Sequence, residues 1–331
     1  MNRSYIAIIG PALAKANNGN WQTARRWQQF LKLDYHVACM TDWQAAVDAA
    51  PALMVALHAR RSASAIAAFA AAFAQRPLVW VLTGTDLYRD IAVDPAAQRS
   101  LALATRIVVL QTAGMGALPA ALREKAQVIY QSAATLTPHA GSSRARHFTV
   151  IMIGHLRAEK APQTFMQAAA LVTSPRVRLL HVGAALEPAL GLLAQQTQAT
   201  SSRYAWRGDL PQPQARQCLK RSALMVISSR MEGGANVIIE AVTSGVPVLA
   251  SDIDGNRGML GPDYAGYFPV DDSAALARMI DRAAGDPVFY ALLRQQCALR
   301  APLFAPARER AAVVELVDNC LSNLNQSTGT Q

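Results

Sequence analysis

One stretch of the chain, from Ser228 to Gly255, constrains the fold more than any other: SSRMEGGANVIIEAVTSGVPVLASDIDG. The apolar run just before it, Ala223 to Ile227, predicts a buried strand that stops at a loop. From Asn236 onward apolar residues recur at helical spacing until a glycine and a proline end the helix, and Val248 to Ala250 predicts the next strand. Strand, glycine turn, helix and strand form one βαβ unit, which predicts a parallel α/β sheet.

Two carboxylates bracket the helix start in this unit. In open α/β sheets ligands bind at the carboxyl ends of the strands, so the free N–H groups near Gly234 to Val237 suit a phosphate. Glu232 lies in the loop before the helix and Glu240 lies about one turn inside it. A carboxylate can hold a pair of vicinal hydroxyls, so the pair suits a hexose and a ribose with a diphosphate between them. The plainer alternative is that Glu232 favours the helix dipole and Glu240 is solvated.

Length and charge limit the classes of protein that fit. At 331 residues the chain suits two domains, and its net charge of +10 favours anionic partners such as nucleotide sugars, phosphates, nucleic acid or an acidic membrane surface. The four cysteines are far apart, which argues against a zinc site and fits a reducing cytoplasm. No apolar run approaches the roughly 18 residues that span a bilayer. We expect a cytoplasmic protein without stable membrane association.

Strand and helix alternate along the first 140 residues. The predicted strands are Tyr5–Ile9, Tyr35–Ala38, Leu53–Leu57, Leu78–Leu82 and Ile107–Leu110. Because the carboxyl ends of parallel strands lie on one edge, polar residues that follow them are candidates to bind a small anion: Arg60, Arg61, Thr83 and Thr85. The loop after the first strand precedes a predicted helix, Trp21 to Leu31, with Asn20 as its N-cap. This loop adds Asn18, Gly19 and Asn20 as candidate contacts.

The second half of the chain opens after a stretch rich in Pro, Gly and Ser, 133–147, which predicts a linker. We therefore expect one domain over 1–140 and a second over 148–305, with a helix at about 308–324 packing back on the first. After the predicted strand Phe148–Ile153, the sequence GHLRAEKAP places Arg157 and Lys160 where both can reach a diphosphate on the Glu232 loop. Arg207, in a later turn, would border the base of a nucleotide.

The E-x7-E spacing after a strand and a Gly-Gly turn, followed by SGVPV, resembles the donor-binding signature of the family 4-type glycosyltransferases. That resemblance implies an α/β GT-B fold, with two Rossmann-like doubly wound domains facing a central cleft. In this fold the loop after the first strand faces the sugar donor, which implies that Gly19 and Asn20 contact the donor. It implies that Arg157 and Lys160 hold the diphosphate, Glu232 contacts the hexose and Glu240 takes the ribose hydroxyls. The backbone that would bind hexose and phosphate comprises Gly233, Gly234, Ala235, Asn236 and Val237. The commoner pattern has arginine where this chain has His155, so the arginine role passes to Arg157.

Four segments narrow the resemblance: GPALAKANNGNWQTARRW, ALHARRS, LTGTDLYRD and VIYQSA are similar to the selenosugar synthases of the selenoneine pathway. This implies that a UDP-hexose, UDP-GlcNAc or UDP-glucose, is joined to selenophosphate. Many relatives in the wider family carry a histidine near the hexose where this chain has Thr83. An anionic selenium nucleophile is already deprotonated and hardly requires a general base, so an acceptor such as selenophosphate fits.

Two other functions stay open from the sequence. An oxygen-glycosyltransferase acting on a lipid or polysaccharide would use an apolar and basic patch, for which Trp21, Arg25, Arg26 and Trp27 are candidates. A non-catalytic protein that binds anions or nucleic acid would fit the charge, yet the arginines are scattered and no recognition motif is present, so we expect no nucleic-acid partner. Asp252 and Asp254 are interpreted as loop residues, and we expect neither a cofactor nor a required metal.

Overall fold

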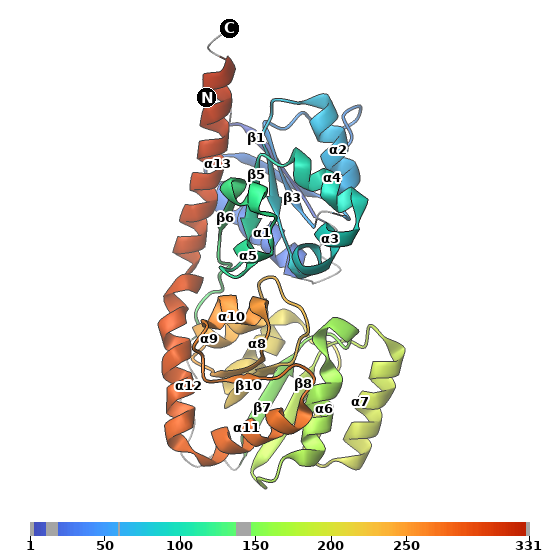
Figure 1. Cartoon of the computed structure of the whole chain (residues 1–331), viewed down its shortest axis with the longest axis vertical. Helices are drawn as coiled ribbons and strands as arrows, with labels where there is room; N and C mark the ends of the chain where they lie inside the picture. Colours follow the sequence, from blue (N-terminus) through green and yellow to red (C-terminus); the bar gives the residue numbers. More distant parts are fainter. Residues whose placement is uncertain (1–2, 11–18, 59, 137–146, 329–331) are drawn as a thin grey trace. The chain divides into compact units, whose positions relative to one another are not determined.

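The computed structural model describes residues 3–10, 19–58, 60–136 and 147–328 (Figure 1). The chain divides into two compact units. Unit 1 comprises Met1–Gln131 and Pro306–Gln331, and unit 2 comprises Ser132–Ala305. Each unit contains one six-stranded sheet whose strand pairs are parallel, which confirms the α/β class expected from the alternating pattern.

The sheet of unit 1 has the strand order β2-β1-β3-β4-β5-β6. Its strands are β1 Tyr5–Ile9, β2 His36–Met40, β3 Leu53–Leu57, β4 Leu78–Val81, β5 Arg106–Val109 and β6 Ala126–Val128. Its α-helices are α1 Gly19–Leu31, α2 Ala63–Ala72, α3 Ile91–Val93, α4 Pro95–Leu103, α5 Gly114–Ala117 and α13 Pro306–Thr328. The chain leaves β1 toward β2 and leaves β3 toward β4, on opposite sides. The neighbouring ends of β1 and β3 therefore form the topological switch point where ligands of such sheets bind.

Helices cover both faces of this sheet because each presents one apolar side to it. Helices α1 and α13 belong to the same unit (Figure 1) and contact each other on one face, where Trp27 and Leu31 pack with Val313 and Val317. On the other face Phe69 and its neighbours on α2 join a separate apolar cluster. The last helix of the chain thus completes the core of the first unit.

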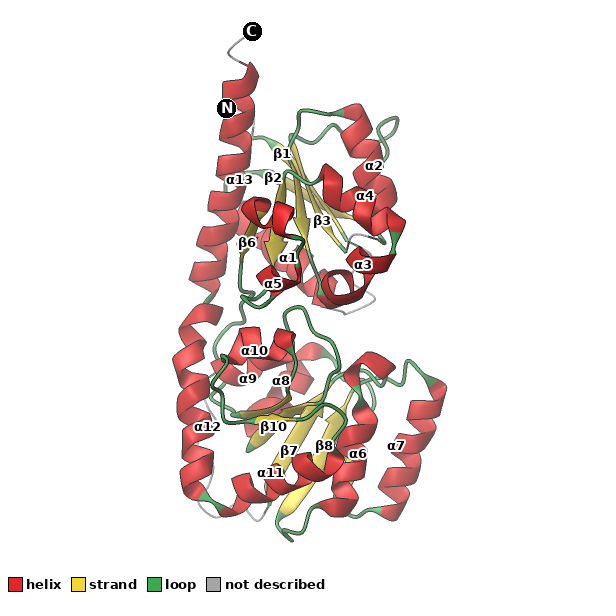
Figure 2. Cartoon of the chain, viewed as in Figure 1, coloured by secondary structure: helices red, strands yellow, loops and turns green. Residues whose placement is uncertain are grey.

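The sheet of unit 2 has the order β12-β11-β10-β7-β8-β9. Its strands β10, β7 and β8 are labelled in Figure 2. Its strands are β7 Phe148–Ile153, β8 Val177–Val182, β9 Tyr204–Trp206, β10 Leu224–Ile227, β11 Val248–Ser251 and β12 Tyr267–Phe268. Its α-helices are α6 Pro162–Leu171, α7 Pro188–Thr200, α8 Gln212–Arg221, α9 Asn236–Thr243, α10 Asp254–Leu260, α11 Ser273–Gly285 and α12 Pro287–Arg300. This is the doubly wound order of dinucleotide-binding domains, with its switch point between β7 and β10.

Two expectations about local structure are wrong. The first helix begins at Gly19 rather than Trp21, with the Thr23 hydroxyl bonded to the Gly19 carbonyl at 2.9 Å, so Asn20 lies inside α1 and is not its N-cap. Asp254 is the first residue of α10 rather than a loop residue. Asp252 does lie in the loop, where one carboxylate oxygen accepts a 2.8 Å hydrogen bond from Arg257.

Within the described residues, no helix combines the length and the apolar character that crossing a membrane requires.

Candidate functional site

The switch point of unit 2 is built by the loops that follow β7 and β10. The buried hydroxyl of Ser228 donates to the carbonyls of Lys160 and Ala161, both at 3.0 Å. The Arg230 amide donates to the Glu159 carbonyl at 2.9 Å. These bonds fix the Lys160 turn against the end of β10. The two segments that the sequence indicated for a diphosphate and a sugar therefore lie side by side.

Lys160 and Glu232 form an ion pair at this point. The same Glu232 oxygen accepts a 2.6 Å hydrogen bond from the Ser229 hydroxyl, and the side chain is largely buried. The loop that carries Glu232 also needs Gly255, because a Cβ there would lie 2.0 Å from the Glu232 carbonyl oxygen. Lys160 and Glu232 were predicted as site residues from the sequence, whereas Ser228 and Ser229 were not. The feature that could have indicated the two serines is their place directly after a buried strand.

Arg157 and His155 share the loop with Lys160 but differ in charge. Arg157 has no carboxylate partner among the described residues, and its Nε atom is buried without a hydrogen bond. The His155 Nδ1 atom accepts a 3.1 Å bond from the Ala184 amide, so the ring is held by its own domain. Desolvation lowers the pKa of His155 against the opposing charge of Asp209, and Arg157 and Lys160 lower it further. Because a neutral imidazole carries no charge, Arg157 and Lys160 are the side chains that make this loop positive.

The start of α9 faces the same loop region. The helix begins at Asn236, as the sequence predicted, and its N-cap residue Ala235 has no side chain that could accept from the first-turn amides. Gly233 and Gly234 lead into this turn. Unsatisfied amides and the helix dipole make such a terminus suited to an anion.

Glu240 lies on α9 and is also largely buried. It accepts a 3.0 Å hydrogen bond from Gln212 Nε2, and Arg216 Nε lies 3.9 Å from the same oxygen. Both partners lie on one face of α8, four residues apart, a spacing that the sequence analysis did not use. Arg207 is exposed after the edge strand β9, and β8 separates it in the sheet from the β7–β10 switch point.

Unit 1 carries the residues predicted for the acceptor, together with Gly19 and Asn20, which were predicted to contact the donor. Gly19 and Asn20 are the first two residues of α1, and Asn18 lies outside the described residues. Arg60 and Arg61 are exposed after β3, with Arg60 Nε 3.8 Å from a carboxylate oxygen of Asp90. The remaining two candidates, Thr83 and Thr85, follow β4 and bond to buried side chains.

The Thr83 amide and hydroxyl donate to Asp86 Oδ2 at 3.2 and 2.8 Å. Thr85 Oγ1 lies 3.4 Å from His58 Nε2. Position 83 itself carries a hydroxyl, but the end of β3 brings the His58 imidazole beside this loop. Its signal was a histidine directly after a fully apolar strand.

A metal ion is one use that this cluster suggests. Ligand atoms of His58, Asp86 and Asp90 lie within 4.8 Å of one another. However, Arg89 Nε is 3.1 Å and Arg60 Nε is 3.8 Å from the oxygens of Asp90. Two guanidinium groups already balance that carboxylate and would repel a cation, so these residues do not fit a metal centre well.

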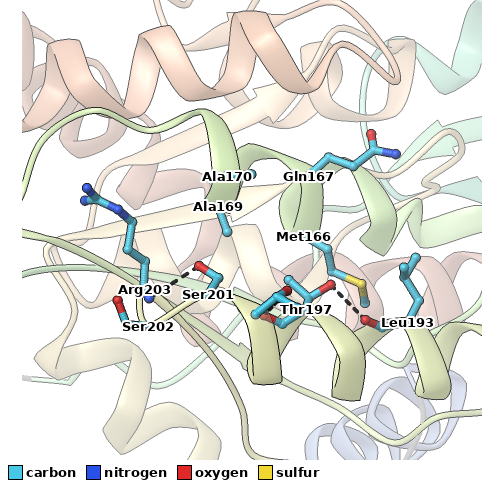
Figure 3. A pocket seen from close by; sticks show the side chains of 10 residues that line it. Met166, Gln167, Ala169, Ala170, Leu193, Thr197, Ser201, Ser202 and Arg203 are labelled. Carbon is cyan, nitrogen blue, oxygen red and sulfur yellow. Dashed lines mark hydrogen bonds between the residues drawn. The ribbon is translucent and has the colours of Figure 1, made fainter.

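A groove between α6 and α7 lies apart from the residues of the switch point (Figure 3). Its lining includes Thr197 of α7 and Ser201, Ser202 and Arg203, which precede β9. It therefore opens at the amino ends of the strands, whereas the residues described above follow the carboxyl ends.

Comparison with known proteins finds a family match within unit 2 and likenesses to several solved structures. Residues 147–286 match the model of the family described as Glycosyl transferases group 1. HepE of Anabaena, solved with UDP and glucose, is 18% identical with a TM-score of 0.75 over 96% of this chain and 100% of that one. Sucrose-phosphate synthase of Thermosynechococcus elongatus is 16% identical with a TM-score of 0.78, over 97% and 100%.

A third structure, the apo form of the lipopolysaccharide outer core galactosyltransferase WaaB, is 12% identical with a TM-score of 0.67, over 98% of this chain and 99% of that one. Comparison with curated protein sequences finds no match. The structural likenesses confirm the GT-B fold class that the sequence predicted.

Proposed function

We propose that this chain is a glycosyltransferase that takes its sugar from a UDP-hexose bound by unit 2. The observation that carries the proposal is the meeting of Arg157, Lys160 and Glu232 at the β7–β10 switch point, beside an uncapped helix start. The family match over residues 147–286 includes all of these positions. HepE, of the same fold, was solved with UDP and glucose, which supports a UDP-sugar as donor.

In this proposal each group of the switch point has one task. Arg157, Lys160 and the amides at the start of α9 hold the diphosphate, Glu232 contacts the hexose, and Glu240 takes the ribose hydroxyls. As the bond from the anomeric carbon to the diphosphate oxygen breaks, its electron pair leaves with UDP. The two cations and the helix dipole stabilise the charge that grows on the diphosphate. Because Lys160 is paired with Glu232 in the structure, donor binding exchanges this ion pair for contacts with the ligand.

The acceptor that we propose is selenophosphate, held by unit 1. Its selenium atom attacks the anomeric carbon, a C–Se bond replaces the C–O bond, and UDP is released. The support is the similarity of the first-half segments to selenosugar synthases together with two exposed cations, Arg60 and Arg61, at the edge of the sheet. The proposed product is a selenosugar for selenoneine biosynthesis.

Mass spectrometry tests both levels of the proposal. The purified chain is incubated with UDP-GlcNAc or UDP-glucose, with and without selenophosphate generated in the same tube. UDP release that depends on selenophosphate, with a selenium isotope pattern on the sugar, is the expected result. UDP-sugar binding without a selenium product would contradict the proposed acceptor and agree with the proposed donor. A chain that binds no UDP-sugar would contradict both proposals.

One observation favours a second candidate, an oxygen-glycosyltransferase. The His58 imidazole beside Thr85 is a group that an alcohol acceptor would use as a general base. Transfer to a sugar or lipid alcohol in the same assay, or binding of the chain to liposomes, would establish this candidate in place of the selenium acceptor.

We also propose that the reaction requires no metal, because the lysine, arginine and helix dipole already face the leaving group. The enzyme treated with EDTA and then freed of it by gel filtration is expected to keep its full rate of UDP release. A rate that falls and returns on adding Mg²⁺ or Mn²⁺ would contradict this and direct attention to His58, Asp86 and Asp90.

A further inference from the structure

A buried histidine, His58, lies at the carboxyl ends of the unit 1 strands, and no role was predicted for it from the sequence. His58 is the first residue after β3, and β3 and β1 are the neighbours that form the switch point of this sheet. The register pairs Leu57 with Val81, so His58 lies level with the residue that precedes Thr83. Its position is thus the one in which a doubly wound unit presents groups to a ligand.

The backbone of His58 has a positive φ, a conformation that is rare for residues other than glycine. Its φ of 68° lies in the left-handed region, which is unfavourable for a residue with a Cβ. The turn is then tied on both sides: the His58 carbonyl accepts from the Ser62 amide at 3.0 Å, and the Ser62 hydroxyl donates to Leu57 O at 2.8 Å. Glycine would adopt this turn without strain. A bulky residue at such a place indicates a function for its side chain.

Asp86 sets the orientation of the ring. His58 Nδ1 lies 2.7 Å from Asp86 Oδ1, and Asp86 is fully buried. Because Asp86 Oδ2 already accepts two hydrogen bonds from Thr83, the carboxylate acts as an acceptor on this side. A proton must lie between Nδ1 and Oδ1 at this distance, although the contact lacks the alignment of a full hydrogen bond. The tautomer is therefore fixed, and Nε2 is left facing the Thr85 hydroxyl.

We infer that His58 contacts the anionic group of the acceptor through Nε2, and that Asp86 is the positioning residue that holds the ring for this contact. The inference rests on the proposed function and names the acceptor subsite within unit 1. Thr85 provides a hydroxyl beside Nε2, and Arg60 and Arg61 follow in the same turn and provide positive charge. Because the Nδ1 proton faces Asp86, Nε2 carries the lone pair of the ring and would accept a hydrogen bond from a protonated phosphate oxygen of the acceptor. The opposing explanation is that the pair merely ties the end of β3 to the end of β4.

Amide substitutions separate these two explanations. Glutamine can place its amide oxygen, an acceptor, near the position of Nε2, and asparagine can place an N–H near Nδ1. For His58→Asn we expect the KM for selenophosphate to rise about tenfold to a hundredfold, the usual effect of losing a hydrogen bond to a charged group, with the KM for the UDP-sugar unchanged. His58→Gln should lose less, and Asp86→Asn should affect the same KM. His36→Asn, on the exposed β2 residue, is the matched control.

If His58 only ties two loops, His58→Asn will keep the KM for selenophosphate and His58→Gln will lower the melting temperature more. That pattern would overturn the inference. Circular dichroism melting of each variant shows whether it folds.

A second measurement does not depend on turnover. In protein labelled with 15N-histidine, the His58 ring signals are identified by their loss in His58→Gln. Inorganic phosphate is then titrated in the presence of saturating UDP, which occupies the cations of unit 2. We expect the Nε2 signal to shift with phosphate and not with matched chloride, and an unchanged signal would overturn the inference. This holds whether or not the wild-type chain makes a selenium product, so failure of the proposed acceptor remains a separate result.

Discussion

The ion pair between Lys160 and Glu232 joins two residues that are 72 positions apart in the chain. Each was named from the residues around it, a basic residue after one strand and an acidic residue before one helix. Their pairing depends on the strand order, which places β7 next to β10, and periodicity along the chain does not specify that order. For the same reason the His58–Asp86 pair was not predicted, although each residue lies shortly after a predicted strand in the sequence. Single candidates could be found from sequence, but their partners could not.

Replacing Lys160 by alanine tests the leaving-group role. We expect kcat to fall by about 10² to 10³, the usual cost of removing one group that stabilises transition-state charge. Arg230→Ala is the matched control, because Arg230 lies on the Glu232 loop but pairs at 2.8 Å with Asp271 in an exposed ion pair. Steady-state UDP release measures both variants. A Lys160→Ala enzyme with the wild-type rate would refute the role.

The buried His181 gives unit 2 a pH-dependent stability. Burial lowers the pKa of His181 from its ordinary 6.5 to about 4, while Tyr204 contacts its Nδ1 atom at 2.9 Å. Above pH 6.5 the residue is neutral in both states and its contribution is full. As the pH falls the unfolded state takes up the proton first, so the free energy of unfolding decreases until the pH reaches about 4. The loss over that window is on the order of 3 kcal/mol.

Urea denaturation between pH 7 and pH 4 checks this expectation. The variant His181→Gln should show a smaller decrease in unfolding free energy over the window, and the exposed His36→Gln should match the wild type. An equal pH slope in His181→Gln and the wild type would show that other groups cause it.

At the scale of elements, strands were easier to delimit than the turns between them. β1, β3 and β7 have the predicted bounds because each is an apolar run that stops at polar or turn residues. The start of α10 and the π-helical turn Asp86–Asp90 were not predicted. Both are set by contacts with other segments: Gly255 fits against the Glu232 backbone, and Asp86 Oδ1 lies 2.7 Å from Nδ1 of His58 at the end of β3. Tertiary contacts, rather than local propensity, decide these turns.

The attachment of α13 to α1 depends on one buried carboxylate. Glu309 accepts hydrogen bonds from Trp27 Nε1 at 2.9 Å and from Arg26 Nε at 2.6 Å. Replacing Glu309 by alanine leaves both donors without this partner, so we expect the free energy of unfolding of unit 1 to fall by about 3–5 kcal/mol. Glu315→Ala, on an exposed position of the same helix, is the control. Urea denaturation measures both, and equal losses would contradict the importance of this contact.

At the scale of the whole molecule, the two units differ in continuity. Unit 2 is one uninterrupted segment, whereas unit 1 is closed by residues from the far end of the chain. The residues proposed to hold the diphosphate, hexose and ribose, Arg157, Lys160, Glu232 and Glu240, all lie in unit 2. We therefore expect donor binding to persist when the integrity of unit 1 is lost.

Deleting residues 306–331 tests that separation. It removes Val313, Leu316 and Val317 from the unit 1 core, and each buried apolar side chain is worth about 1.5–3 kcal/mol. We expect unit 1 to lose its protection against proteolysis while calorimetry still detects UDP binding. Deleting only 325–331 keeps those three residues and should leave both properties intact. Loss of UDP binding in the longer deletion alone would show that donor binding needs an intact unit 1.

The position of α13 also has a consequence for how the protein is made. A ribosome that adds roughly 5–20 residues per second completes the strands of unit 1, then spends roughly ten to thirty seconds on residues 132–305 before α13 is synthesised. Throughout that interval the apolar side of α1 and its sheet is without the helix that covers it. The nascent chain is therefore a natural client for a chaperone that shields apolar surfaces, and unit 2 can finish folding before the unit that precedes it.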